Sequence, residues 1–427
     1  MKNLFLNIIK SEIFRNTSIL VSGTVLAQLI PILLQPILRR YYSVDDFGAY
    51  SIYLSLVSVF VSMASLKYEL AIVLPKRDKE SANVLFWALL SNSIFCILML
   101  FIIFLLKSHI LELINLPDEK SIYLYLVPVG VFFLNGYQSI NYWLIRKKGF
   151  FSISVNKFGR RGFEGATQLS AIPFKISGGL LYGDIVGNLS NFFLGIFQCA
   201  RKGFNKKYLS LVKVKYVLKK YSYFPLYNLV TGVMSAFSFS LPLLFINKFY
   251  SLEYTGFLDM TRMLLSIPLA LVAISLANVI LQRVSESYRN KRSVAKELLS
   301  IGIVIFVLAI VEIIVIRFWG VEIFTVFFGK QWEYSGEISK VLVLSYAFNF
   351  FVTTFNTIFI GLNRIKILSI WQAFYFFSIL GLSLLGNLSF MSFLQIYVTI
   401  EVLCSVVLIG LMVYIVTSYE QKIRVAR

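Results

Sequence analysis

Hydrophobic residues come in long blocks separated by short polar segments. The blocks 84–106, 257–281, 298–316 and 389–416 contain few charged residues, and each has about the 20 residues that a helix needs to cross a bilayer. We therefore expect an all-α integral membrane protein with about twelve transmembrane helices. The apolar stretches between charged residues predict spans at 17–38, 47–66, 82–106, 121–145, 150–174, 181–200, 225–247, 257–281, 297–316, 338–362, 367–387 and 390–416.

Composition supports this class. Of the 427 residues, 58% are hydrophobic and 15% are charged, whereas soluble domains contain about 25% charged residues. These values exclude a soluble enzyme, a nucleic-acid-binding domain and a disulfide scaffold, and no nucleic-acid partner is expected. The net charge of +20 therefore concerns orientation in the bilayer.

The basic residues alternate between the two predicted sides of the membrane. With the N-terminus in the cytoplasm, 28 of the 41 Lys and Arg residues fall in inside segments, nine fall in outside segments and four fall within spans. This asymmetry follows the positive-inside rule and favours twelve spans with both termini cytoplasmic. The polar N-terminal segment 1–16 lacks a small-residue cleavage site, so we do not expect a removed signal peptide.

A short repeat and a basic segment divide the chain near its middle. The motif at 42–48 (YSVDDFG) parallels 250–256 (YSLEYTG) at a constant offset of 208 residues. Six spans per half restore the starting orientation, so we expect two parallel six-helix bundles around a central cavity. The predicted parts are an N-terminal bundle (1–200), a basic cytoplasmic linker (201–224) and a C-terminal bundle (225–427). We interpret the linker's eight basic residues as topology markers; the alternative is an amphipathic segment lying on anionic headgroups.

Several of these segments together resemble a known family. The segment 36–48 (PILRRYYSVDDFG) is similar to the opening of Wzx-type oligosaccharide flippases, which belong to the polysaccharide transporter family of the multidrug/oligosaccharidyl-lipid/polysaccharide (MOP) exporter superfamily. Segments 223–228 (YFPLYN), 256–262 (GFLDMTR) and 328–336 (FGKQWEYSG) resemble that family's motifs in the same order. The similarity extends over essentially the whole chain.

The resemblance implies a function. Such a flippase translocates undecaprenyl-pyrophosphate-linked oligosaccharide units from the inner to the outer leaflet of the bacterial cytoplasmic membrane by alternating access. It implies the lipid bilayer, a polysaccharide polymerase and chain-length proteins as partners, and no cofactor. The related lipid II flippases usually have fourteen spans, whereas multidrug antiporters share the twelve-span plan.

Two other functions remain open at this point. One is a multidrug or ion antiporter of the same superfamily, which would favour an acidic cavity, whereas the charge predicted within spans here is more basic. The other is a membrane polysaccharide polymerase or glycosyltransferase, which needs sizeable catalytic loops. The longest outside segment, 317–337, is short and hydrophobic, so we do not expect catalytic residues.

The fifth span contains a cationic stripe. Lys157, Arg160 and Arg161 stand at i, i+3 and i+4, with Glu164 on the same face. Exposing each charge to lipid would cost about 2.5–3.5 kcal/mol, so we expect the stripe to face a hydrated cavity or a partner helix. Arginine matches phosphate oxygens, which makes these unpaired cations candidate pyrophosphate ligands. The alternative is an interfacial helix over 150–163 whose cations reach headgroups.

Other polar residues within spans are also candidates. Arg262 is a substrate-binding candidate, although our preferred interpretation pairs it structurally with Asp259. Asp259, Glu312 and Glu401 are candidates for coupling to protons or sodium, because a desolvated carboxylate titrates nearer neutrality.

Neutral polar residues complete the list of candidates. Gln28 lies one heptad before Gln35, and Asn349 and Asn356 bracket Thr353 at i, i+4, i+7 spacing. These amides could contact sugar hydroxyls, or they could join helices by hydrogen bonds. With three separated cysteines and a single histidine, His109, in the sequence, we expect no metal site.

Overall fold

The computed structural model describes residues 12–425. Residues 1–11 and 426–427, which belong to the predicted cytoplasmic termini, lie outside the described range. The regular secondary structure within that range is helical. Two compact units are present, Met1–Ser240 and Leu241–Arg427, and the predicted linker 201–224 falls within the first.

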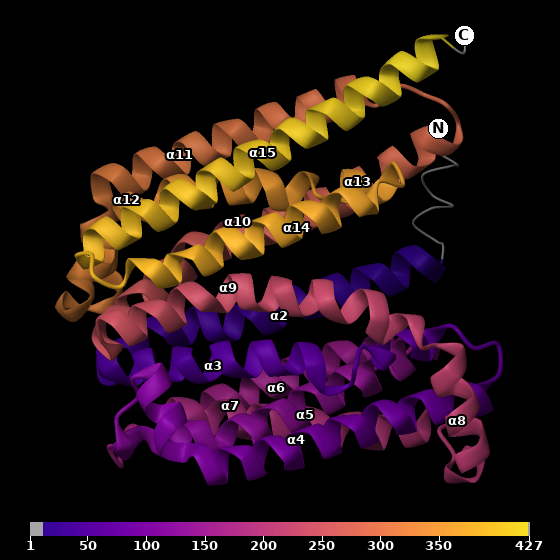
Figure 1. The fold of residues 1–427 in the computed structure, drawn as a ribbon, viewed down its shortest axis with the longest axis horizontal. Coiled ribbons are helices and arrows are strands. Elements are labelled where there is room, and N and C mark those ends of the chain that lie inside the picture. The colour runs from indigo at the N-terminus through magenta and orange to yellow at the C-terminus, as the bar shows by residue number, and fades with distance from the viewer. Residues whose placement is uncertain (1–11, 426–427) are drawn as a thin grey trace. The chain divides into compact units, whose positions relative to one another are not determined.

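The first unit is a bundle of long helices that run alongside one another (Figure 1). Short helical turns and the helix α8 connect them. Its elements are α2 (Glu12–Tyr41), α3 (Val44–Ala64), η1 (Tyr68–Val73), α4 (Asp78–Ile114), η2 (Asp118–Lys120), α5 (Ser121–Arg146), α6 (Phe150–Ser170), α7 (Gly179–Arg201), η3 (Lys206–Tyr208), α8 (Leu211–Lys220), η4 (Phe224–Asn228) and the first part of α9 (Leu229–Phe249).

The second unit has the same general character. Its helices are also long, and α12 and α14 end in short helical segments. The elements after α9 are α10 (Leu252–Arg289), α11 (Ala295–Phe328), η5 (Lys330–Trp332), α12 (Glu333–Phe355), α13 (Thr357–Gly361), α14 (Ile365–Leu380), η6 (Gly381–Leu385) and α15 (Phe390–Val425).

Every predicted span coincides with helix, and several helices are longer than predicted. In particular, α4 continues to Ile114, so the predicted outside loop that held His109 is largely helical, with a kink at Leu106. Nine helical segments of the described chain are long and apolar enough to cross a membrane. Helices α5, α6 and α10 are not among the nine. Four charged residues between Lys157 and Glu164 make α6 more polar.

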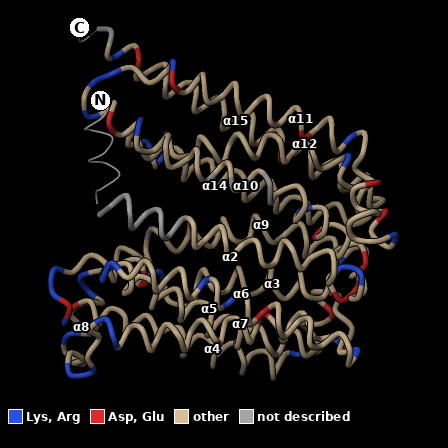
Figure 2. The backbone as a smooth tube through the Cα atoms, turned by 180° about the vertical axis from the view of Figure 1, so that it is seen from behind, with Lys and Arg blue, Asp and Glu red and all other residues tan. Residues whose placement is uncertain are grey.

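The surfaces of these helices require an apolar environment. Only 11% of the most apolar stretch of α11 is buried, and water would not accommodate so large an exposed apolar surface. Figure 2 shows the charged residues mainly toward helix ends in each unit. The protein is therefore a multi-pass membrane protein.

The repeated motif has the same structural role in both units. Ser43 is the N-cap of α3 and accepts a hydrogen bond from the amide of Asp46. Ser251, 208 residues later, is the N-cap of α10 and accepts one from the amide of Tyr254 at 3.3 Å. A serine oxygen at this position satisfies a helix amide that has no partner within its helix. The repeat is thus a helix start shared by both units.

The basic segment packs onto the first unit. Val214 and Val217 on α8 are buried. Asn83 on α4 forms two hydrogen bonds with the backbone just before α8. Its Nδ2 donates to the carbonyl of Tyr208 and its Oδ1 accepts from the amide of Ser210, both at 2.9 Å. The ammonium of Lys220 donates a hydrogen bond to Glu80 at 2.6 Å, which raises the pKa of Lys220. Helix α8 is therefore fixed to α4 by polar contacts near both of its ends.

Candidate functional site

Helices α6 and α7 approach each other closely because α7 carries glycine at two positions one turn apart. A Cβ atom at Gly183 would lie 2.9 Å from the carbonyl oxygen of Glu164, and one at Gly187 would lie 2.9 Å from that of Arg160. Both distances are shorter than ordinary contacts. Small residues four apart permit such close packing of membrane helices. The glycines therefore bring the cationic stripe of α6 against α7.

Asp184, between these glycines, is the centre of a buried polar cluster. Its side chain is 3% exposed and lies 3.3 Å from Nη2 of Arg160. The hydroxyl of Tyr53 on α3 donates to Oδ2 at 3.1 Å, and Nδ2 of Asn188 donates to the same oxygen at 2.9 Å. A buried carboxylate needs such partners because desolvation of an isolated charge is unfavourable by several kcal/mol. We call Asp184, Arg160, Tyr53 and Asn188 the Asp184 cluster.

The other two cations of the stripe also contact protein side chains. Nη1 of Arg161 lies 2.7 Å from Oε2 of Glu164, and Nζ of Lys157 donates to the Thr24 hydroxyl on α2 at 2.8 Å. The prediction of an unpaired cationic cluster is therefore wrong for both arginines, because two buried carboxylates partly neutralise them. Three cations face two carboxylates, which leaves one excess positive charge.

The stripe is nevertheless accessible in part. The side chains of Arg160 and Arg161 are 23% and 32% exposed, whereas Asp184 and Glu164 are 3% and 9% exposed. The carboxylates thus anchor the arginines from the buried side and leave part of each guanidinium uncovered. An arginine held in this way retains N–H donors for an external anion.

The second unit contains a comparable cluster around Glu401 on α15. Glu401 is 6% exposed, and the hydroxyl of Tyr375 on α14 donates to its Oε1 at 2.6 Å. Arg262 on α10 interacts electrostatically with Glu401 and donates from Nε to the hydroxyl of Tyr346 on α12 at 3.2 Å. Arg262 and Glu401, which the sequence named as separate candidates, are both buried and belong to one cluster, which we call the Glu401 cluster.

The two remaining carboxylate candidates lie on α10 and α11 of the second unit. Asp259 is one turn before Arg262 on α10 and is half-buried. Glu312 on α11 is also half-buried, and its Oε2 is buried without a hydrogen-bond partner among the described residues. The structure does not bring Glu312 together with Glu401.

The neutral candidates are dispersed. Gln28 is half-buried on α2, and Asn349 is exposed on α12, where its Oδ1 accepts from Thr353 at 2.9 Å. Asn356 lies at the junction of α12 and α13, so the predicted row of amides does not continue along one helix. Their distribution gives no converging sugar site within the described part of either unit.

Sequence reasoning missed several members of both clusters. Asp184 lies within the predicted span 181–200, so the rule that selected Glu401 also applied to it. Tyr53 and Tyr375 carried no comparable signal, because tyrosine is common in membrane proteins.

Comparisons with known proteins agree with this architecture. The family model described as polysaccharide biosynthesis protein matches residues 37–337, while a search of curated proteins gave no match. The solved structure of the lipid II flippase MurJ, in an inward closed conformation, matches with a TM-score of 0.74 and 14% sequence identity. The match covers 95% of this chain and 91% of the MurJ chain.

Two further solved structures share the fold. An inward-facing multidrug resistance transporter of the MATE family has a TM-score of 0.67 at 12% identity, with 92% of this chain and 96% of that chain covered. A MOP superfamily transporter from Pyrococcus furiosus has a TM-score of 0.61 at 12% identity, with 95% of each chain covered. The family match covers more than half of the sequence and reaches into both units. The chain therefore belongs to the polysaccharide biosynthesis protein family, and it is a multi-pass membrane protein that shares the fold of MOP superfamily transporters.

Proposed function

We propose that this transporter is a flippase that moves undecaprenyl-pyrophosphate-linked oligosaccharide units from the inner to the outer leaflet of the bacterial cytoplasmic membrane. The proposal includes twelve spans in two six-helix bundles (1–200 and 225–427) around a central cavity, with 201–224 as cytoplasmic linker and both termini cytoplasmic. A polysaccharide polymerase and chain-length proteins would act with it. The family match supports a role in polysaccharide biosynthesis, and the fold is shared with a lipid II flippase.

The observation that carries the proposal is the cationic stripe of α6. A pyrophosphate group cannot enter hydrocarbon without countercharge, since transfer of even one ion has an idealised cost of order 20 kcal/mol. Lys157, Arg160 and Arg161 supply three cations on one helix face, and the two arginines are partly exposed. Guanidinium groups offer paired donors to phosphate oxygens. We therefore assign the headgroup to this stripe.

The carboxylates fit the resting state of such a site. Without substrate, Asp184 and Glu164 pair with Arg160 and Arg161 at 3.3 and 2.7 Å, which offsets part of the cost of burying the two carboxylates. A pyrophosphate would compete for the exposed donors of the same arginines. Alternating access would then proceed by movement of the two bundles around this site.

The Glu401 cluster is the candidate for coupling and for a second substrate contact. Arg262 would approach the headgroup from the second half of the chain, while Glu401, Asp259 and Glu312 would carry a proton or sodium ion. Gln28, Asn349 and Asn356 would contact the glycan. Buried carboxylates in both units also suit a multidrug or ion antiporter. The two functions are therefore distinguished by identifying the transported substrate.

The test is a translocation assay in proteoliposomes with labelled undecaprenyl-pyrophosphate oligosaccharide. Wild-type protein should move label to the opposite leaflet, whereas the neutral double variant Arg161→Gln/Glu164→Gln should lose most translocation. The matched control is Lys340→Gln/Glu337→Gln, which removes the exposed i, i+3 pair on α12 (2.9 Å). Extrusion of cationic dyes without glycolipid movement would instead establish the antiporter. Equal translocation by the two double variants would show that the cationic stripe does not bind the headgroup.

A further inference from the structure

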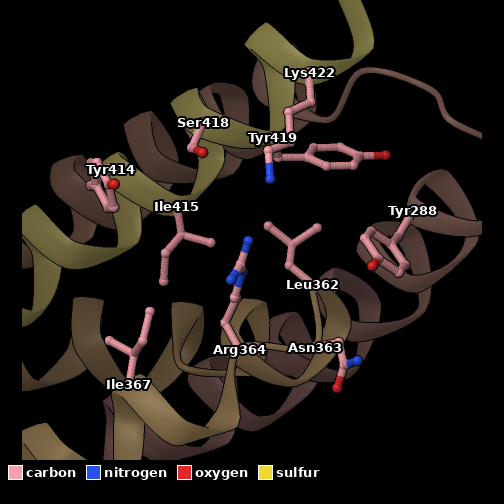
Figure 3. A pocket seen from close by; sticks show the side chains of 10 residues that line it. All are labelled: Tyr288, Leu362, Asn363, Arg364, Ile367, Tyr414, Ile415, Ser418, Tyr419 and Lys422. Carbon is pink, nitrogen blue, oxygen red and sulfur yellow. The ribbon is translucent and has the colours of Figure 1, made fainter. Parts of the chain in front are cut away.

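One end of the second unit contains a pocket that the proposed transport cycle does not use. Its volume is about 490 Å³, and it lies between the end of α10, the α13–α14 connection and the last turns of α15 (Figure 3). Arg364 and Lys422 enter it from opposite sides, and Tyr288, Tyr414 and Tyr419 form much of its wall. The volume is within the range of pockets that bind small molecules.

The pocket is positively charged and contains no carboxylate among its described lining residues. Figure 3 shows Arg364 and Lys422 directing their nitrogen atoms toward the same space. Both side chains are exposed, and neither has an ion-pair partner in the described part of the chain. Glu420, close by on α15, is occupied elsewhere: its Oε1 accepts hydrogen bonds from the amides of Val294 and Ala295 at the start of α11. Two cations thus converge on one space without countercharge.

The backbone fixes the position of these cations. Arg364 is the N-cap residue of the 16-residue helix α14, so the positive end of that helix dipole adds to the field of its guanidinium. Across the pocket, the hydroxyl of Tyr419 donates to the carbonyls of Ser287 and Arg292 at 2.9 and 3.1 Å. These bonds hold the C-terminal part of α15 against the end of α10. The pocket is therefore part of the folded unit.

The surroundings point to a lipid as the source of the anion. Helices α14 and α15 belong to candidate membrane spans, and apolar side chains on these two helices are strongly exposed, with Ile370 on α14 at 73% and Val413 on α15 at 57%. Acyl chains can lie on these surfaces while a headgroup occupies the pocket. Basic pockets between membrane helices bind anionic headgroups in this way.

We propose that this pocket binds the phosphate of an anionic membrane phospholipid through Arg364 and Lys422. The tyrosines enclose the headgroup, and the exposed faces of α14 and α15 contact the acyl chains. In the predicted topology the pocket is at the cytoplasmic side. This binding does not depend on the identity of the transported substrate.

The test uses the purified full chain in detergent, with binding followed by native mass spectrometry and by the shift in thermal unfolding midpoint. The probes are short-chain phosphatidylglycerol, phosphatidylcholine of equal chain length and glycerol 3-phosphate. Phosphatidylglycerol should bind wild type most tightly. Arg364→Gln/Lys422→Gln should weaken that binding by about tenfold or more, because the charge-assisted hydrogen bonds to the phosphate are lost.

The matched control, Arg292→Gln/Lys296→Gln, removes one exposed arginine and one exposed lysine at the start of α11 and the turn before it, and it should bind like wild type. Arg364→Lys/Lys422→Arg retains both charges and should keep most of the affinity. If the double glutamine variant does not fold, each single variant should show part of the loss.

Equal binding of phosphatidylcholine, or unchanged binding by the glutamine variants, would overturn the proposal. Glycerol 3-phosphate binding as tightly as phosphatidylglycerol would overturn the lipid assignment.

Discussion

Asp184 illustrates how a single residue determines what a cationic stripe can do. Its side chain is 3% exposed and lies 3.3 Å from the partly exposed Arg160, so the arginine is half of an ion pair rather than a single cation. Removing one partner of a buried pair is more destabilising than replacing both, because the remaining charge has lost its solvent and its partner. The Asp184 cluster must therefore be tested by comparing single with double substitutions.

We expect Asp184→Asn to lower the free energy of unfolding by about 1–3 kcal/mol, since Arg160 loses its charged partner in a buried site. Asp184→Asn/Arg160→Gln should recover part of that loss. Thermal unfolding of the purified protein measures both. Asp118→Asn is the control, because Asp118 also forms an ion pair, with Lys107 at 2.7 Å, but is 79% exposed. Equal effects at 184 and 118 would contradict the structural role of the cluster.

Sequence spacing identified the basic residues of the Asp184 cluster and its neighbours on α6, but not all of their acidic partners. The i, i+3, i+4 pattern placed Lys157, Arg160 and Arg161 on one face, and that face does contact other helices. The partner of Arg161, Glu164, is three residues away on the same face, but the partner of Arg160 could not be assigned, because Asp184 is 24 residues from Arg160 and the contact depends on how α6 packs against α7. Charge partners across helices depend on tertiary packing, which local periodicity does not encode.

At the scale of elements, glycines set the distance between α6 and α7. Replacing Gly187 with alanine would place a Cβ 2.9 Å from the Arg160 carbonyl oxygen and 2.9 Å from Cβ of Glu164. Neither neighbour is the end of a flexible side chain, so the helices must separate. We expect Gly187→Ala to lower the thermal unfolding midpoint and to reduce translocation, because it displaces Arg160.

A second glycine provides the control for that experiment. A Cβ added at Gly162 on α6 would meet nothing within 4 Å among the described residues, so Gly162→Ala should leave stability unchanged or raise it slightly, as alanine favours helix by up to about 1 kcal/mol over glycine. Comparable losses for Gly162→Ala and Gly187→Ala would show that helix packing is not the cause.

The attachment of α8 to α4 gives another prediction. Asn83 is fully buried and bonds the backbone of Tyr208 and Ser210. Asn83→Ala leaves these groups without their partner, which is unfavourable by about 1–3 kcal/mol. We expect faster tryptic cleavage at Lys213 and Lys215 in limited proteolysis. Asn205→Ala, which removes only a local exposed bond to the amide of Lys207, should leave the cleavage rate unchanged.

Element positions were largely predictable, whereas element lengths and packing were not. Apolar blocks marked most of the long helices, because these must remain in an apolar environment, whereas α8 (Leu211–Lys220) lies in the segment predicted only as a basic linker. Helix ends were harder to place: α4 and α11 continue to Ile114 and Phe328, well past the predicted limits at 106 and 316. Both predicted limits fall just before a charged residue, Lys107 and Arg317, and the helices continue past these charges.

For the whole molecule, the strongest internal evidence is the repeat at an offset of 208 residues. Ser43 and Ser251 cap α3 and α10, and Asp45 and Glu253 occupy the equivalent first-turn position. If six spans separate the copies, both helix starts face the same side of the membrane. The basic helix α8, which lies between them in the sequence, should then face the opposite side, in accordance with its lysine content.

Cysteine labelling tests this arrangement directly. Asp45, Glu253 and Lys213 are exposed, whereas the native Cys96, Cys199 and Cys404 are buried and should react slowly. We expect Asp45→Cys and Glu253→Cys to react with a membrane-impermeant maleimide from the periplasmic side of intact cells, and Lys213→Cys only after permeabilisation. Asp45 and Glu253 occupy the same first-turn position of α3 and α10. Different labelling of the two cysteines would therefore reflect the side of the membrane and not the position in the helix. Labelling of positions 45 and 253 from opposite sides would establish an inverted repeat, and an inverted repeat would require an odd number of spans in each half.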